Sequence, residues 1–388
     1  MNRREFITAA ATSVMAVALH AEESRRRLRV AVIGHTGRGN YGHELDTLWR
    51  LLPEVEVVAV ADADAAGLAK AQKKLKLAKG FADYHAMLAE AKPDIVSIAP
   101  RYIDEHRDMA LAAVDAGVRG IYMEKPFCRT PAEADEIVAA CHSRGVKLAL
   151  AHRNRHHPAL PVVKRMVKEG EVGRLLELRG RGKEDERGGV LDLWVLGSHV
   201  LNLAHFIAGK PVACTATLLQ DGRPVTRADV QEGDEGVGPI AGDELHARFE
   251  MESGVPVFFD SVRKAGSKEV GFGLQLIGTK GIIDLSVDVD QFAQLLPGSP
   301  FRPTNEARAW QPIRPTGPDV AEQVKSHELS ARDLLAAMRE DREPLCSAAD
   351  GRVTVEMICA VLESHRLNGQ RVTFPLATRQ NPLGLLKG

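Results

Sequence analysis

The sequence lacks several features that would assign it to common classes of protein. It has five cysteines, an odd number without a CxxC pair, so we expect no disulfide framework. Its 51 basic and 52 acidic residues give a net charge of −1, which excludes strong electrostatic attraction to nucleic acid or an anionic membrane. Beyond the N-terminus we find no apolar run that indicates a membrane span, and no internal repeats. A chain of 388 residues suits two globular domains.

The first 21 residues differ from the remainder. Arg3 and Arg4 form a twin-arginine start, an alanine-rich stretch of weak hydrophobicity follows, and small residues permit cleavage after Ala18 or Ala21. This pattern predicts a twin-arginine (Tat) export signal over 1–21 and a periplasmic mature protein. An ordinary secretory signal and a frayed cytoplasmic tail are the alternatives.

Apolar runs alternate with helical patterns in the first part of the chain. We predict buried strands at 28–33, 55–61, 95–99, 120–123 and 147–151, with helices at 63–77, 104–116 and 131–143. The strands are nearly continuous in Val, Ile, Leu and Ala, as expected when both faces of a sheet are covered. The alternation predicts an α/β domain over 27–152 with a doubly wound parallel sheet.

After about residue 155 the pattern changes. Helices are predicted at 161–169, 191–207, 328–341 and 349–367, and strands at 174–180, 211–219, 243–251, 255–263, 270–278 and 281–287. Strands that follow one another without intervening helices indicate an open, mostly antiparallel sheet. We therefore predict a C-terminal α+β domain over 153–388, with loops at 221–242 and 297–318.

A glycine-rich turn follows the first strand. Gly34 and Gly39 occupy the first and third places of a GxGxxG pattern, Thr36 occupies the middle place, and Gly37 and Arg38 lie between. In dinucleotide-binding domains such a turn opens a helix whose N-terminus binds pyrophosphate. An ordinary glycine loop is the alternative.

An acidic residue ends the second strand. Asp62 lies 23 residues after Gly39, where a carboxylate accepts hydrogen bonds from the adenosine ribose and repels a 2′-phosphate. This position favours NAD over NADP. Asp64, two residues later, is a rival acidic residue in this region, and its position also suits a helix cap.

The fourth apolar run ends in Glu124-Lys125-Pro126. Lys125 therefore emerges at the carboxyl edge of the predicted parallel sheet, where open α/β sheets bind ligands. A lysine ammonium there can polarise a forming carbonyl and exchange a proton. A solvated lysine before a helix is the alternative.

Motifs along most of the chain resemble those of the Gfo/Idh/MocA oxidoreductases. They are Val30-Ala-Val-Ile-Gly34 with the glycine turn, Ala99-Pro100 with His106-x-x-Met-Ala-Leu, Glu124-Lys125-Pro126, Gly197-Ser-His199 and Ile277-Gly-Thr-Lys-Gly281. The resemblance implies an N-terminal Rossmann domain, a C-terminal domain whose sheet often mediates dimers, a nicotinamide cofactor, and a sugar or polyol substrate.

The resemblance also implies roles for single residues. Lys125 would contact both nicotinamide and substrate, Glu124 would hold it, and Pro100 and His106 would line the cofactor site. His199 would be catalytic, although a core histidine is the alternative.

The family often has an aspartate four residues before its catalytic histidine, and this chain has Val195 there. Asp192, seven residues before His199, remains a catalytic candidate, yet a regular helix would place it about 10 Å away. Asn202, one turn after the histidine, would touch it or a substrate hydroxyl.

Two further groups are candidates for substrate contact. The charged loop 180–188 contributes Lys183, Glu184, Asp185 and Arg187, and a solvated loop is the alternative. Residues 152–158 carry three histidines together with Arg155, at the domain junction, where the family has an arginine facing cofactor or substrate. Their spacing matches no strong metal signature, so we expect no metal.

These observations predict an exported oxidoreductase that carries tightly bound NAD and acts on a sugar, polyol or sugar derivative. One alternative is a redox-neutral glycoside hydrolase or lyase, which oxidises a sugar carbon, eliminates, and returns the hydride. Another is a non-catalytic sugar-binding protein on a dehydrogenase scaffold. We expect a homo-oligomer, a dimer or tetramer, without nucleic-acid or membrane partners.

Overall fold

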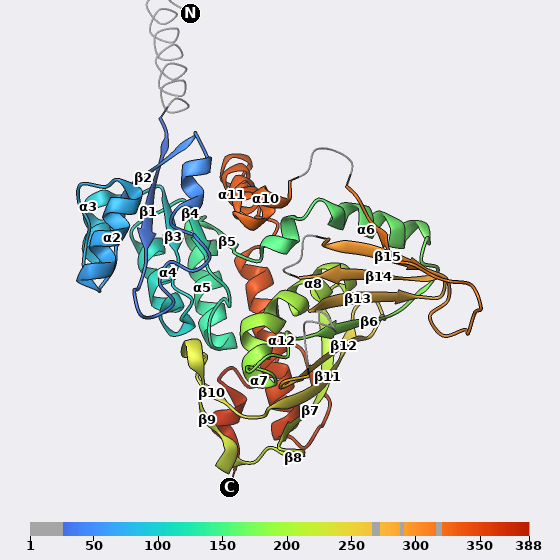
Figure 1. Cartoon of the computed structure of the whole chain (residues 1–388). Coiled ribbons are helices and arrows are strands. Elements are labelled where there is room, and N and C mark those ends of the chain that lie inside the picture. Colours follow the sequence, from blue (N-terminus) through green and yellow to red (C-terminus); the bar gives the residue numbers. More distant parts are fainter. Residues whose placement is uncertain (1–25, 266–271, 288–290, 316–319, 388) are drawn as a thin grey trace, which may run out of the picture.

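The computed structural model describes residues 26–265, 272–287, 291–315 and 320–387. They form two large sheets with their covering helices, and a third sheet of two short strands (Figure 1). The predicted export signal at 1–21 lies outside the described residues.

The N-terminal sheet has five parallel strands in the order β2-β1-β3-β4-β5. The strands are β1 (Leu28–Ile33), β2 (Val55–Ala61), β3 (Ile95–Ile98), β4 (Gly120–Met123) and β5 (Lys147–Leu150), and the helices are α2 (Ala65–Leu75), α3 (Tyr84–Ala91), α4 (His106–Asp115) and α5 (Pro131–Arg144). The predicted doubly wound sheet is confirmed. Helix α3 was not predicted from the sequence, because eight residues are too few for a clear helical period.

One predicted helix is replaced by turns. After the glycine turn the chain forms consecutive turns and a short 3₁₀ helix, Leu48–Leu51. Asn40, Gly42 and Glu44 have φ angles of 55°, 56° and 64°, and left-handed residues at this spacing interrupt a right-handed helix. The expected helix N-terminus for pyrophosphate is therefore not formed directly after Gly39.

The second sheet is mixed and mostly antiparallel, with β16-β15-β14-β13-β6-β12-β11-β7-β17 as its strand order and β8 paired to β7. The neighbouring strands β6 and β12 run parallel. The strands are β6 (Leu175–Arg181), β7 (Pro211–Gln220), β8 (Arg223–Pro224), β11 (Glu244–Met251), β12 (Val257–Val262), β13 (Gly273–Gly278), β14 (Gly281–Ser286), β15 (Ala293–Pro297), β16 (Gln311–Pro312) and β17 (Val372–Thr373). The open, mostly antiparallel sheet predicted from the sequence is thus confirmed.

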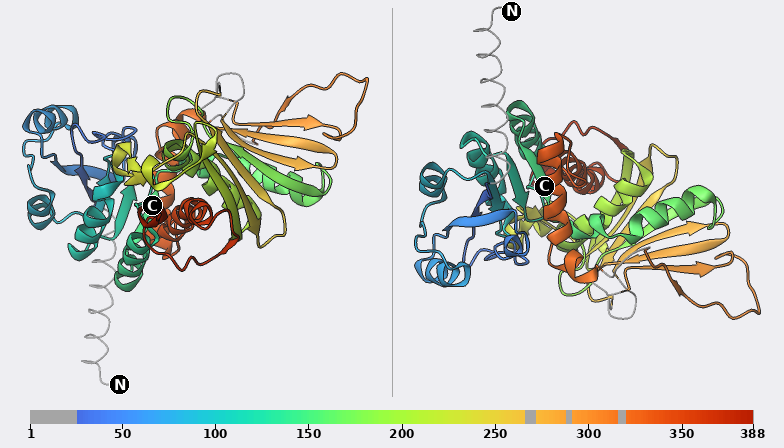
Figure 2. Two further views of the ribbon diagram at one scale, coloured as in Figure 1. Left: turned by 90° about the horizontal axis from the view of Figure 1, so that it is seen from below. Right: turned by 90° about the horizontal axis from the view of Figure 1, so that it is seen from above.

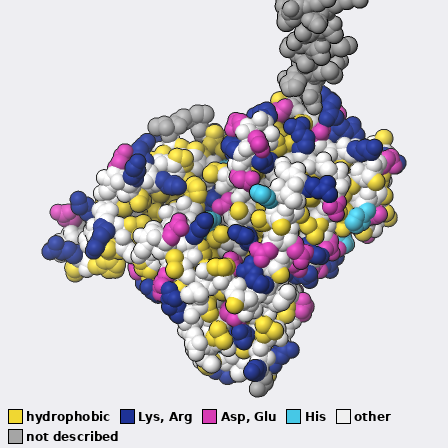
Figure 3. All heavy atoms as spheres, turned by 180° about the vertical axis from the view of Figure 1, so that it is seen from behind, with side chains coloured by type: hydrophobic (Ala, Val, Ile, Leu, Met, Phe, Trp, Pro, Cys, Tyr) yellow, Lys and Arg dark blue, Asp and Glu magenta, His cyan; other side chains and the backbone are white. Residues whose placement is uncertain are grey.

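Helices cover one face of this sheet (Figure 2). They include α6 (Ala159–Glu169), α8 (Ser198–Ala208) and α12 (Ala348–Arg366). Helix α11 (Glu328–Glu340) packs against β4 and β5, and α10 (Ala321–Lys325) packs against α11. Basic and acidic side chains are interspersed on the molecular face of Figure 3, in keeping with a net charge near zero.

A helical segment at Val190–Ala208 is long and apolar enough to cross a membrane by length and composition alone, contrary to our reading of the sequence. It comprises α7 (Val190–Asp192), a π-helical turn (Leu193–Gly197) and α8. Most of its residues are buried, so its apolar character serves the core of the protein.

The predicted loop 221–242 contains short elements that reach the N-terminal domain. They are a 3₁₀ turn at Arg227–Asp229, β9 (Gln231–Glu232), a 3₁₀ turn at Asp234–Gly236, and β10 (Pro239–Ile240). A Cβ on Gly236 would lie 2.4 Å from an oxygen of Asp104, which shows how closely this segment packs beside the glycine turn. The segment therefore crosses between the two sheets.

Candidate functional site

The glycine turn is longer than the sequence prediction allowed. Gly37, Gly39 and Gly42 have positive φ angles of 86°, 85° and 56°. A Cβ on Gly39 would lie 2.3 Å from the backbone nitrogen of Arg101, and one on Gly42 would lie 2.5 Å from Glu124 Oε2. These glycines form a complete GxGxxG pattern, a second register that is also present in the sequence.

The Asp62 carboxylate ties this turn to the end of β2. It is 1% exposed and accepts hydrogen bonds from Thr36 N at 3.0 Å and Thr36 Oγ1 at 2.7 Å, from Tyr41 Oη at 2.9 Å, and from Asp64 N at 3.0 Å. Burial and the charge of Asp62 raise the pKa of Tyr41, so Tyr41 remains a donor. Asp64 caps α2 through Gly67 N at 2.6 Å. A ribose hydroxyl would have to displace Thr36 or Tyr41 from Asp62.

The other predicted cofactor residues of the turn have different surroundings. Gly37 is exposed and a Cβ there would meet no atom within 4 Å, which leaves its backbone accessible to a ligand. Arg38 lies over the ring of Tyr102, 4.7 Å from its centroid, and pairs with Asp104. Gly34 packs under Tyr41, since a Cβ at this position would lie 2.1 Å from the Tyr41 ring. The accessible part of the turn is therefore its tip.

A buried acid lies at the carboxyl end of β4. Glu124 is fully buried and accepts hydrogen bonds from the backbone and ring nitrogens of His43 at 3.4 and 3.3 Å. Burial alone would raise the pKa of Glu124, but the hydrogen bond and charge of His43, with the charge of Lys125, lower it to about 2. Glu124 therefore stays ionised and links the glycine turn to Lys125.

Lys125 lies between the two domains. It is 5% exposed and its Nζ donates a hydrogen bond to the carbonyl oxygen of Val195 at 3.1 Å. The Lys125–Pro126 peptide bond is cis. His106 is fully buried, with Nδ1 2.9 Å from the Pro126 carbonyl and Nε2 2.8 Å from the Pro100 carbonyl. His106 therefore braces the backbone around the lysine, a supporting role rather than the direct cofactor contact we expected.

His199 lies near Lys125, on helix α8 of the C-terminal domain. It is 9% exposed, and its Nδ1 lies 3.2 Å from Nδ1 of His152, with the two rings edge to face. Burial and the positive charge of Lys125 lower the pKa of His199, and the same two causes lower that of His152 to about 3. Both rings are thus neutral near pH 7, and a neutral imidazole can act as a general base.

Val195 contributes its backbone to the site. Its carbonyl oxygen accepts the hydrogen bond from Lys125 Nζ. This residue lies within the π-helical turn, and such turns are frequent at functional sites. The lysine is therefore positioned by a main-chain oxygen.

Asp192 is not placed for catalysis. Its carboxylate accepts hydrogen bonds from Lys183 N at 3.2 Å, Glu184 N at 3.1 Å and Ser261 Oγ at 2.6 Å. Burial raises its pKa. Asp192 therefore joins the charged loop to β12, a structural role in place of the catalytic one we predicted.

Arg155 and Asn202 also have structural roles instead of the predicted substrate contacts. Arg155 is 4% exposed and donates to Asn202 Oδ1 at 3.0 Å, to Leu345 O at 3.0 Å and to Asp350 Oδ1 at 2.9 Å. Asn202 donates in turn to Thr354 Oγ1 at 3.1 Å. These bonds join the region after β5 to α8 and α12, so both side chains are committed to holding the fold.

The charged loop 180–188 divides into buried and accessible residues. Glu184 is fully buried, pairs with Arg181 and accepts a hydrogen bond from Val262 N at 3.0 Å, so it is not available to a sugar. Asp185 and Arg187 pair with each other and are about one-third exposed. Lys183, Asp185 and Arg187 are partly exposed and remain predictions for substrate contact.

Within the described residues no group of three or more His, Cys, Asp or Glu side chains could hold a metal ion. His157 stacks on Phe292 with 4.2 Å between ring centroids, and burial lowers the pKa of His156 to about 4.

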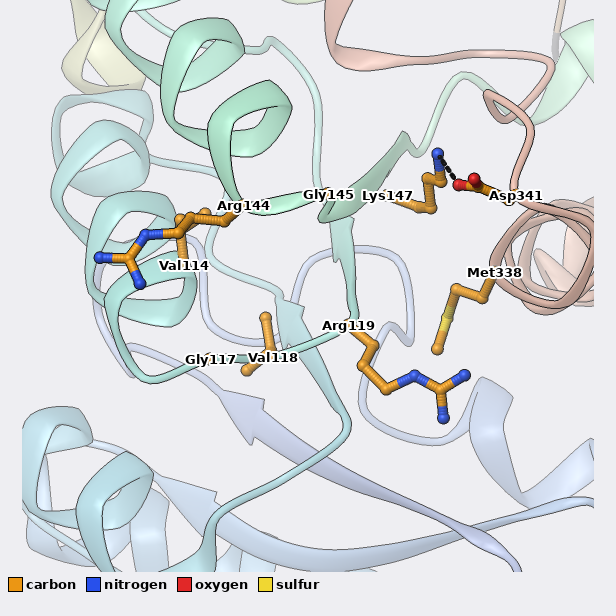
Figure 4. A pocket seen from close by; sticks show the side chains of 9 residues that line it. All are labelled: Val114, Gly117, Val118, Arg119, Arg144, Gly145, Lys147, Met338 and Asp341. Atoms are coloured by element: carbon orange, nitrogen blue, oxygen red, sulfur yellow. Dashed lines mark ion pairs between the residues drawn. The ribbon is translucent and has the colours of Figure 1, made fainter. Parts of the chain in front are cut away.

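A hollow of about 260 Å³ lies at the amino edge of the parallel sheet, the edge opposite to Lys125. Figure 4 shows that the guanidinium groups of Arg119 and Arg144 point in different directions, and Lys147 is paired with Asp341 at 2.9 Å. Both arginines lie near helix C-termini, where positive charge is favourable. Because its cations do not converge, this hollow is not a candidate active site.

Several residues of the interdomain site were missed from the sequence. Tyr41 and His43 follow the glycine turn and bond to Asp62 and Glu124. His327, just before α11, lies 2.8 Å from the Tyr122 hydroxyl in β4. The GxGxxG pattern of Gly37, Gly39 and Gly42 is a sequence signal that could have pointed to Tyr41 and His43. No sequence signal points to His327.

Comparison with known proteins supports the two-domain architecture. Residues 28–152 match the model of the Gfo/Idh/MocA oxidoreductase family, described as an NAD-binding Rossmann fold. The chain is 25% identical over 257 residues to levoglucosan dehydrogenase of Pseudarthrobacter phenanthrenivorans, covering 60% of this chain and 65% of that protein. It is 31% identical over 195 residues to D-apiose dehydrogenase of Paraburkholderia graminis, covering 47% and 51%. The matches thus span about half to two-thirds of these relatives.

A solved structure of levoglucosan dehydrogenase in complex with NADH and L-sorbose has a TM-score of 0.70 at 22% identity, and covers 90% of this chain and all of that chain. At this identity the likeness establishes a shared fold.

Proposed function

We propose that this protein is an NAD-dependent oxidoreductase, because residues 28–152 match the model of the Gfo/Idh/MocA oxidoreductase family, described as an NAD-binding Rossmann fold. Its substrate is a sugar, a polyol or a sugar derivative, and the reaction transfers a hydride at a carbon that bears a hydroxyl group. The names of relatives such as levoglucosan dehydrogenase and D-apiose dehydrogenase support this substrate class.

One observation carries the proposal: Lys125 lies close enough to His199 for its charge to lower the pKa of that buried, neutral histidine of the other domain. Lys125 leaves β4 at the carboxyl edge of the parallel sheet, and the Val195 carbonyl fixes its ammonium. His199 belongs to α8 of the other domain. A bound NAD supplies the hydride acceptor or donor. Lys125 stabilises negative charge on the substrate oxygen, and His199 takes or returns the hydroxyl proton.

The glycine turn supports NAD binding at its accessible tip, and Asp62 supports it once a ribose hydroxyl displaces Thr36 or Tyr41. The backbone at Gly37 is accessible, the positive φ angles at Gly39 and Gly42 allow close packing of the turn, and Asp62 lies at the end of β2. A buried carboxylate at Asp62 would repel the 2′-phosphate of NADP. We therefore propose NAD as the preferred cofactor.

We also propose that the Tat signal exports the folded protein with NAD already bound, to the periplasm. Free NAD is not expected there, so the cofactor must be regenerated in place. This need supports a second candidate, the redox-neutral cycle in which a glycoside is oxidised, eliminated or hydrolysed, and reduced again. Substitution of both Arg3 and Arg4 by lysine should retain the full-length protein in the cytoplasm, and unchanged export would contradict a Tat signal.

The function is tested by denaturing the purified mature protein and measuring released NAD, followed by a screen of polyols and glycosides. NADH formation with a polyol or free sugar supports net oxidation, and cleavage of a glycoside without net NADH supports the redox-neutral cycle. Absence of bound NAD together with sugar binding without turnover would favour the non-catalytic alternative.

A further inference from the structure

His152 and His199 form a buried pair in which the same ring atom, Nδ1, of each histidine faces that of the other. The two Nδ1 atoms lie 3.2 Å apart, and the ring centroids 5.0 Å apart at an interplanar angle of 89°. His152 follows β5 of the N-terminal domain and His199 belongs to α8. The contact therefore spans the two domains beside Lys125.

A hydrogen bond between two Nδ1 atoms restricts the tautomers of both rings. A neutral imidazole has one N–H and one lone pair. If one Nδ1 donates, the other must accept, so the donor ring has its lone pair at Nε2 and the acceptor ring has its N–H at Nε2. Only one ring of the pair can therefore be a base at Nε2.

The surroundings keep this pair neutral. Burial, the largest cause, and the cations Lys125 and Arg155 lower the pKa of His152, while the anions Glu124 and Asp350 act in the opposite direction. Burial and the charges of four basic side chains lower the pKa of His199; these are Lys125, His152, Arg153 and His43. The hydrogen-bonding side chain at Nδ1 of His199 is His152, 3.2 Å away. The neighbour that can orient the His199 ring is thus a neutral histidine.

We propose that His152 is a positioning residue for His199. This inference rests on the proposed hydride transfer. His199 Nδ1–H donates to His152 Nδ1, and this bond leaves the lone pair of His199 at Nε2 for the substrate hydroxyl proton.

The proton balance follows from this arrangement. As the substrate carbon loses its hydride, the substrate O–H bond breaks and an N–H bond forms at His199 Nε2. The ring becomes an imidazolium, and its Nδ1–H bond to His152 becomes a charge-assisted and therefore stronger hydrogen bond. In the reverse reaction the Nε2 proton returns to the substrate oxygen. A neutral partner avoids placing a second buried carboxylate beside Glu124.

The test compares two substitutions at one position. His152→Phe keeps a planar ring but removes the acceptor, whereas His152→Asn restores a side-chain oxygen that can accept from His199 Nδ1. We expect His152→Phe to lower kcat at least about tenfold with KM and bound NAD unchanged, and His152→Asn to recover most of the loss. In a His199→Gln background, His152→Phe should change kcat less than about twofold, because the two residues act as one unit.

Spectroscopy tests the hydrogen bond without relying on turnover. In ¹⁵N spectra of the imidazole groups, the wild-type protein should show His199 as the Nδ1–H tautomer, and His152→Phe should remove this preference. An Nε2–H tautomer of His199 in the wild type, equal losses in His152→Phe and His152→Asn, or a full loss in the His199→Gln background would overturn the proposal. A wild type without turnover of any sugar contradicts the proposed function instead, while the spectra still decide the pairing.

Discussion

Replacement of Lys125 by methionine separates its chemistry from its packing. Methionine retains much of the side-chain volume and removes the ammonium. The Val195 carbonyl then loses its donor at 3.1 Å, which costs about 1–3 kcal/mol if the oxygen stays buried. Glu124 also loses one of the charges that hold its pKa at about 2, although His43 remains beside it.

Part of this loss of stability is offset, because methionine avoids the free-energy cost of burying an ammonium group. We therefore expect Lys125→Met to lower the free energy of unfolding by at most about 3 kcal/mol, which is a decrease of several degrees in Tm. Turnover should fall at least about 10²-fold, since a charge-assisted contact to the substrate oxygen is lost. The protein should still release NAD on denaturation.

The assay measures turnover, bound NAD and Tm on the same preparations. Lys147→Met is the matched control, since Lys147 begins β5 at the opposite edge of the sheet and pairs with the exposed Asp341. This control should leave turnover unchanged. Near-normal turnover in Lys125→Met would remove the lysine from the mechanism, and a loss of NAD or of folding would show that its main role is structural.

Three further predictions concern the cofactor, acid stability and assembly. The protein should bind NAD more tightly than NADP because of Asp62; tighter binding of NADP in a fluorescence titration would refute this reading. The pKa values of buried His152, His199 and His327 are lowered in the folded state, to about 3 for His152 and His327. Below about pH 6.5 the unfolded chain therefore binds more protons than the folded protein, and the free energy of unfolding falls as the pH is lowered. The loss is about 1.4 kcal/mol per pH unit for each fully titrating group. Urea unfolding at pH 7.0 and 5.5 measures this loss, and equal stability at both values would be inconsistent with it. The uncovered face of the second sheet should form a dimer or larger assembly, and light scattering that gives a monomer at micromolar concentration would exclude this assembly.

The sequence predicted the parts of the fold that depend on local patterns. Strands such as Val55–Ala61 are continuous apolar runs because both faces of their sheet are covered. The helix expected after the glycine turn was wrong. Asn40 and Glu44 have left-handed backbone conformations, and no local sequence pattern indicates them. The position of Lys125 followed from the end of a strand, which a sequence does reveal.

Other site residues depend on contacts distant in sequence. Arg155 pairs with Asp350, and Asn202 bonds to Thr354; partners so far along the chain cannot be inferred from spacing. A polar side chain near the domain junction therefore looked like a ligand contact when it was a structural link. The same limit hid His152, whose role depends on its distance from His199.

The π-helical turn at Leu193–Gly197 also bears on how this site could arise or be lost in evolution. A π-helical turn bonds to the fifth residue along where an α-helix bonds to the fourth, so it holds one residue more than an α-helical turn. Removal of one of its residues would leave a regular α-helix and keep Asp192, with the loop it anchors, in place relative to α8. The backbone carbonyl that Lys125 now meets at Val195 would shift, so a single-codon deletion would change the main-chain acceptor of the lysine without altering the charged loop.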